Sequence, residues 1–130
     1  MKKLILLVMA MVLALTACGK KGKPDEVPQE VYDALVPLVS ALDEYVKGEI
    51  DLDDLKRAND AADAVIMPFY ESNTELSTSE KLKAASLLHE MTQLSLLFSK
   101  SYLSIATEED APEKKEFKSI CKSLKKELGM

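Results

Sequence analysis

The chain has 130 residues, and its 17 Lys and Arg against 22 Asp and Glu give a formal net charge of −5. This acidity argues against nucleic acid as a partner, because nucleic-acid binding needs clustered positive charge. Trp is absent, Gly occurs only four times and aromatic residues make up 5% of the chain, a composition that favours helices over a β-sandwich.

The first residues have the organisation of an export signal. Lys2 and Lys3 form a positive start, and an apolar stretch follows from Leu4 to Leu15. A helix of that length rises only about 18 Å, whereas the hydrocarbon core of a bilayer is about 30 Å thick. The stretch therefore fits the apolar region of a signal peptide better than a membrane span.

The apolar stretch ends in Leu15-Thr16-Ala17-Cys18. Cleavage after Ala17 places Leu15 at a position where ordinary signal peptidase needs a small residue. The same four residues match a lipobox, and through residues 1–18 the chain resembles the bacterial lipoproteins as a class. That resemblance implies removal of residues 1–17, a diacylglycerol on the Cys18 sulfur and commonly a third acyl chain, such as palmitate, on the new amino terminus.

The resemblance also implies a location in the cell envelope. Gly19 stands where lipoproteins retained at the Gram-negative inner membrane commonly have Asp, so it implies the outer membrane, facing the periplasm. In a Gram-positive host the protein would lie outside the only membrane. Two or three acyl chains hold a protein firmly, whereas one chain binds marginally. The following lysines either contact anionic headgroups or belong to a soluble tether; they are Lys20, Lys21 and Lys23.

The remaining chain is long enough for one small domain. Residues 18–27 contain Gly, Lys and Pro without periodicity, which predicts a lipidated N-terminus and flexible linker before a helical domain over residues 28–130. The first helix is expected to begin at Pro28 and to end before Gly48 in the C′ position. Pro37 inside it predicts a kink or a split. Its apolar stripe is Val31, Leu35, Leu38, Leu42 and Tyr45.

The second helix has the clearest start signal, because Asp51 is a candidate N-cap and Ile50 and Leu55 have the spacing of a hydrophobic staple. Asn59 interrupts its apolar face. Pro68 predicts that the helix stops just before it or kinks there.

Two further helices complete the pattern. Ser77 and Glu80 have capping-box spacing, and the helix that follows, to about Ala106, is apolar on more than one side, which predicts a central position. The last helix, with Pro112 in its first turn, has the apolar face Phe117, Ile120, Cys121, Leu124 and Leu128. We therefore predict an all-α fold, a small antiparallel bundle of about four helices.

The charges are segregated along the chain. From Asp25 to Ala111 there are 19 acidic and 6 basic residues, whereas from Pro112 to Met130 there are 3 acidic and 6 basic residues. The basic face of the last helix is either solvated, neutralising acidic neighbours, or it faces a partner or a membrane.

The residues for chemistry are few. His89 and Cys121 lie on different helices, so neither a metal site nor a cofactor site is predicted. The aspartates from Asp51 to Asp54 fit helix capping better than a calcium loop. Cys121 lies on a leucine-lined face, where a thiol is inert, so no catalytic residue is assigned and we expect no enzyme. That cysteine is either buried or used between chains.

Two functions remain open. The first is a lipid-anchored, non-enzymatic accessory protein, held to the membrane through Cys18, whose helical domain binds another envelope protein; it predicts an exposed apolar groove or patch. The alternative is a binder of a small apolar ligand, in a cavity opened by Pro37 and Pro68. In that case Asn59 or Tyr70 would supply a polar contact.

Overall fold

The computed structural model describes residues 23–107 and 112–130. This part of the chain forms the helices α2 (Gln29–Val46), α3 (Leu52–Ser72), α4 (Thr78–Thr107) and α5 (Lys114–Glu127) and contains no strand. The fold is therefore an all-α bundle, as predicted. Cys18 and the rest of the proposed signal sequence lie outside the described residues.

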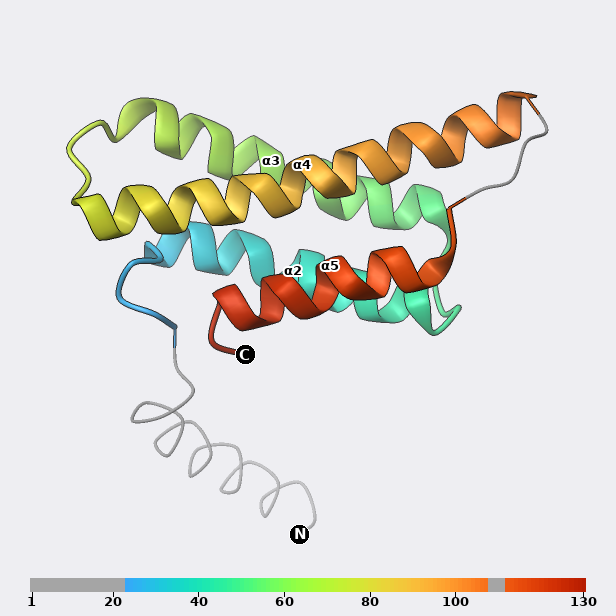
Figure 1. Ribbon diagram of the computed structural model, residues 1–130, viewed down its shortest axis with the longest axis horizontal. Coiled ribbons are helices and arrows are strands. Elements are labelled where there is room, and N and C mark those ends of the chain that lie inside the picture. The colour runs from blue at the N-terminus through green and yellow to red at the C-terminus, as the bar shows by residue number, and fades with distance from the viewer. Residues whose placement is uncertain (1–22, 108–111) are drawn as a thin grey trace, which may run out of the picture.

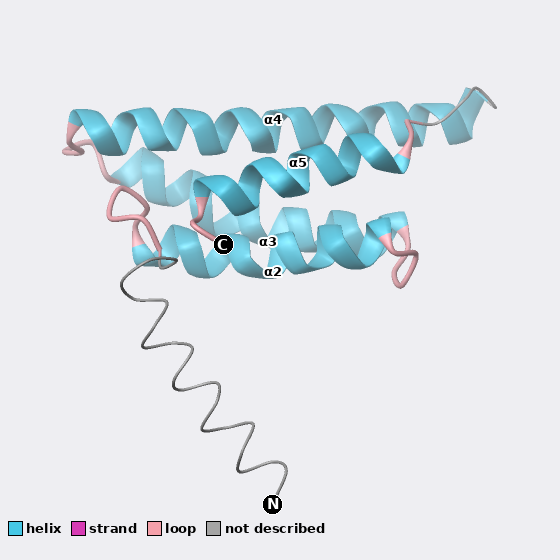
Figure 2. Ribbon diagram, turned by 60° about the horizontal axis from the view of Figure 1, so that its bottom comes forward, coloured by secondary structure: helices cyan, strands magenta, loops and turns pink. Residues whose placement is uncertain are grey.

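Consecutive helices reverse direction, so the chain runs up and down through the bundle (Figure 1). α2 packs against both α3 and α5, and α4 packs against α5. Of the four seams between neighbouring helices, the one between α3 and α4 is the most loosely packed. As a result α3 and α5 occupy opposite corners of the bundle, with α5 between α2 and α4 (Figure 2).

The core is built from the apolar stripes that the sequence predicted. Phe117 of α5 lies at its centre, with its ring edge-on to Tyr45 of α2 at 5.0 Å and to Phe98 of α4 at 6.2 Å between ring centroids. Burial of each large apolar side chain stabilises the fold by about 1.5–3 kcal/mol. The fully buried large residues include Leu35, Leu38, Leu42, Leu55, Ile66, Leu87, Leu94 and Leu124.

Local signals place most helix ends correctly. The Asp54 N–H donates to Asp51 Oδ1 at 2.8 Å, and the Glu80 N–H donates to Ser77 Oγ at 3.2 Å, so both predicted caps are confirmed. Gly48 has φ of 81° just after the C-cap of α2. That left-handed conformation costs little for glycine and more for any residue with a Cβ.

The prolines interrupt the helices less than the sequence indicated. α2 is continuous through Pro37 and α3 continues through Pro68 to Ser72. Of the two outcomes predicted for each proline, the split and the stop are therefore wrong, and a kink stays a prediction. Both prolines are exposed, and water can therefore donate to the carbonyl groups that lose a helical partner. Pro112 lies before α5 instead of in its first turn, because Glu113 is the N-cap.

The folded domain begins slightly before the predicted boundary at residue 28. Val27 is fully buried, and its N–H donates to the Pro24 carbonyl at 3.0 Å. The Lys23 ammonium donates to the Val27 carbonyl at 2.7 Å. The last residues of the predicted linker are therefore part of the fold, and Pro28 is the N-cap of α2.

α4 lies at an edge of the bundle, so its predicted central position is wrong. It packs closely against α5 but only weakly against α3. Apolar side chains outside its main stripe consequently lack neighbours; Leu82, Leu96, Leu103 and Ile105 are 67%, 48%, 58% and 68% exposed. None of the described helices is both long and apolar enough to cross a membrane.

Candidate functional site

The loose seam between α3 and α4 contains an open groove of about 370 Å³. Its size lies within the range of small-ligand and side-chain pockets. We refer to it as the α3–α4 groove. It is lined by Lys56, Asn59, Asp60 and Asp63 of α3 and by Ser95, Phe98, Ser99 and Tyr102 of α4.

Helical spacing brings these residues together. Asn59 and Asp63 are four residues apart on α3, so they lie on one face of the helix. On α4 the spacing of four and then three places Ser95, Ser99 and Tyr102 on one stripe. The short side chains of Ser95 and Ser99 do not fill the space between the two helices.

Asn59 forms the floor of the α3–α4 groove. The residue is only 4% exposed, and its Oδ1 atom has no hydrogen-bond partner among the described residues. A buried polar atom left without a partner costs about 1–3 kcal/mol. The floor therefore carries an acceptor that an N–H or O–H group of a bound molecule, or a water molecule, can satisfy.

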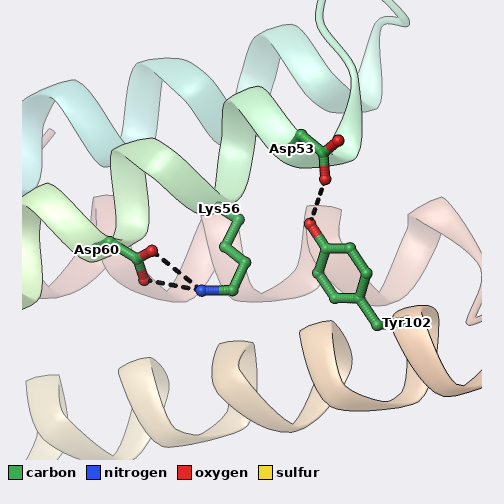
Figure 3. A network of polar contacts seen from close by, with 4 residues as sticks. All are labelled: Asp53, Lys56, Asp60 and Tyr102. Atoms are coloured by element: carbon green, nitrogen blue, oxygen red, sulfur yellow. Dashed lines mark hydrogen bonds and ion pairs between the residues drawn. The ribbon is translucent and has the colours of Figure 1, made fainter.

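Tyr102 of α4 lines the groove, and its side chain points toward Asp53 of α3 (Figure 3). Its hydroxyl donates from α4 to Asp53 Oδ1 on α3 at 2.6 Å. This hydrogen bond, together with burial and the negative charge of Asp53, raises the pKa of Tyr102 to about 12. The hydroxyl is therefore protonated at neutral pH, and its hydrogen bond links α4 to α3.

The rim of the groove is acidic. Lys56 pairs with Asp60 at 3.0 Å on the solvent side (Figure 3). Burial, and then the charge of Asp60, raises the pKa of Asp63. Two carboxylates and one ammonium thus surround the Asn59 amide, an arrangement that favours bound groups that donate hydrogen bonds or carry positive charge.

The structure separates the two polar residues that the ligand-binding hypothesis named. Asn59 lines the α3–α4 groove, but Tyr70 does not, and along α3 the two are about 16 Å apart. The Tyr70 hydroxyl is buried without a partner in the described chain. Pro37 and Pro68 are exposed and line none of this groove.

Sequence reasoning did not single out Tyr102, Lys56, Asp60 or Asp63. Only the positions of these residues along their helices could have indicated a shared site. On α3 the three polar residues lie within one turn of Asn59, and on α4 Tyr102 continues the stripe of Ser95 and Ser99. Such stripes are ordinarily solvent-facing, and only the placement of α3 beside α4 identifies them as one groove.

Cys121 and His89 do not face each other. Cys121 is 3% exposed and its Sγ lies 3.7 Å from the Val39 carbonyl and 3.6 Å from Asp43 Oδ1, both on α2. Burial raises the pKa of this thiol to about 11. His89 is exposed in a separate groove between α4 and α5. Of the two alternatives left open for Cys121, the structure shows burial.

No group of three His, Cys, Asp or Glu side chains within residues 23–107 and 112–130 is arranged to hold a metal ion. No protein-family model, curated protein or solved structure matches this chain.

Proposed function

We propose that this protein is a non-enzymatic lipoprotein of the bacterial cell envelope whose helical domain binds a segment of another envelope protein in the α3–α4 groove. The location is supported by Leu15-Thr16-Ala17-Cys18 after a short apolar stretch. The interaction is supported above all by one observation, the unpaired Asn59 amide oxygen at the floor of an open seam.

The chemistry of the groove indicates what kind of segment it accepts. Phe98 supplies an apolar surface, and Asn59 supplies a buried acceptor. Asp63 adds negative charge at the rim, because Asp60 is already paired with Lys56. A peptide segment with an apolar side chain, an N–H donor and a neighbouring Lys or Arg satisfies all three features.

The alternative, binding of a small apolar ligand, is less well supported. That function calls for an enclosed and mainly apolar cavity. The α3–α4 groove is open to solvent, and half of its lining residues are charged or carry an amide.

Site-specific photo-crosslinking in the host bacterium tests the proposed interaction. A photoreactive residue at Ser99 lies in the groove, whereas one at Ser40, an exposed serine of α2, lies outside it. We expect a discrete protein adduct from position 99 that is absent from position 40. Equal labelling from both positions, or an adduct of small-molecule mass at position 99, would contradict binding of a protein segment.

Because the chain contains only two cysteines, substituting one tests the proposed anchor and substituting the other is the control. Cys18→Ala is expected to abolish lipid incorporation and release the protein from the membrane fraction. Cys121→Ala is expected to leave both unchanged. Membrane fractionation and intact-mass measurement check this, and a mass difference no larger than that of the Cys-to-Ala substitution itself would refute lipidation.

A further inference from the structure

The exposed face of α5 carries a continuous row of positive charge. We call this surface the lysine face; it consists of Lys114, Lys115, Lys118, Lys122 and Lys126. The acidic residues of α5 are used elsewhere: Glu127 pairs with Lys83 of α4 at 2.8 Å, and Glu116 lines the groove between α4 and α5.

Three of these lysines have unneutralised charge. Lys118, Lys122 and Lys126 recur every four residues, are exposed and make no ion pair within the part of the chain that the structure describes. Lys115 pairs with Glu113 at 3.0 Å, and the Lys114 ammonium lies 5.0 Å from the centre of the Tyr45 ring.

The neighbouring surface of α2 does not cancel this charge. Asp43 is the carboxylate at the seam between α2 and α5, and Lys125 already pairs with it at 2.7 Å. The hydrogen bond from Lys125 lowers the pKa of Asp43, and Lys47 contributes in the same direction. This edge of the bundle is therefore basic, whereas residues 25–111 carry a large acidic excess.

The proposed anchor attaches beside this face. Lys23, the first described residue, follows Cys18 by five positions, and five residues span at most about 18 Å. Glu26 and Glu127 line one shared groove, so the chain enters the bundle next to the C-terminal end of α5 (Figure 1). A lipidated Cys18 consequently keeps the lysine face within reach of the membrane surface.

We propose that the lysine face rests on the anionic phospholipid headgroups of the membrane that holds the anchor, an inference that depends on the proposed lipidation of Cys18. An anionic surface attracts this side of the domain and repels its acidic sides. The contact is peripheral, because Phe117 and Leu124 of α5 are fully buried in the bundle. Since α3 lies at the corner opposite α5, the α3–α4 groove then faces away from the membrane (Figure 2).

Lysine acetylation rates of the mature lipidated protein, followed by mass spectrometry, test this orientation. The protein is reconstituted into phosphatidylcholine vesicles, with or without about one third phosphatidylglycerol. Each lysine close to an anionic surface favours the docked state about fivefold. We therefore expect Lys118, Lys122 and Lys126 to react severalfold more slowly on the anionic vesicles, relative to Lys56 and Lys81. The difference should disappear at about 1 M salt, where the Debye length is about 3 Å.

Matched variants control for charge. Lys118→Gln/Lys122→Gln removes two lysines from the face and should lower the ratio of docked to undocked protein about 25-fold, so protection of Lys126 is lost. Lys81→Gln/Lys100→Gln removes the same charge from exposed positions of α4 and should leave Lys126 protected.

The possible outcomes distinguish failure of the proposed lipid anchor from failure of the lysine-face proposal. If the wild-type protein does not float with phosphatidylcholine vesicles, the anchor is wrong. If it floats but its lysines react equally on both kinds of vesicle, the anchor stands and the lysine-face proposal is overturned. Protection seen in native envelopes but absent from anionic vesicles would also overturn it, because the face would then bind an acidic protein.

Discussion

Replacing Asn59 with Leu is expected to stabilise the isolated domain while weakening binding in the α3–α4 groove. Leu is close to Asn in size, so the substitution removes the amide without opening a large cavity. The unpaired Oδ1 atom of Asn59 is buried, and such an atom costs about 1–3 kcal/mol. Removing that cost, and adding apolar contact beside Phe98, should raise the free energy of unfolding by about 1–2 kcal/mol.

Urea denaturation of residues 18–130 with Cys18→Ala, and thermal melting of the same protein, measure this change. For a domain of this size 1 kcal/mol corresponds to a shift in Tm of about 4–8 °C. Asn73→Leu is the matched control, because the Asn73 amide donates to the Phe69 carbonyl at 2.8 Å at the end of α3. Its substitution removes a satisfied hydrogen bond and should be neutral or destabilising.

A destabilisation of Asn59→Leu by 1 kcal/mol or more would refute this reasoning, because the amide would then be satisfied in the folded protein. The same variant should lose the adduct formed from position 99 in cells. Higher stability combined with lost binding distinguishes a functional groove from a structural amide, since a purely structural residue would not change the two in opposite directions.

Three further predictions concern single residues. Tyr102→Phe should cost about 0.5–1.5 kcal/mol at pH 8. Because the pKa of Tyr102 in the folded protein is about 12, above its ordinary value of 10.0, the wild-type advantage should persist below pH 10 and disappear as the pH rises through 12. Urea unfolding at pH 8 and pH 11 should show the stabilities of the two proteins converging. Gly48→Ala should lower stability by about 1 kcal/mol through its φ of 81°, and an unchanged Tm would contradict that strain. Folded Cys18→Ala protein should alkylate at Cys121 far more slowly than urea-unfolded protein, because burial raises the thiol pKa to about 11; equal rates would place the thiol at the surface.

Features that depend on residues close together along the chain could be predicted from the sequence. The caps at Asp51 and Ser77 and the turn at Gly48 are interactions within four or five residues, so their energies do not require a tertiary fold. The apolar face of α5 could be predicted equally well, because helical periodicity alone places Phe117 and Leu124 on one side. These local and periodic signals suffice for an all-α bundle and for the starts of α3 and α4.

The effect of each proline on its helix, and the position of the apolar helix α4 in the bundle, could not be predicted in the same way. Whether Pro37 or Pro68 breaks a helix depends on access of water to the carbonyl that loses its partner, and that access is set by the packing of the other helices. Likewise, the leucines on several sides of α4 show that the helix is apolar but not how many neighbours it has.

The candidate groove belongs wholly to the tertiary structure. Asn59 and Tyr102 are 43 positions apart in the chain, and neither carries a local signal that relates one to the other. They line the same groove because α2 and α5 hold the bundle together while the α3–α4 seam remains open. The helices, their caps and their buried faces could be predicted, since these follow from interactions along one chain segment. Which polar flanks meet, and which amide is left without a partner, depends on distances between segments that periodicity does not specify, so these features emerge only in the folded bundle.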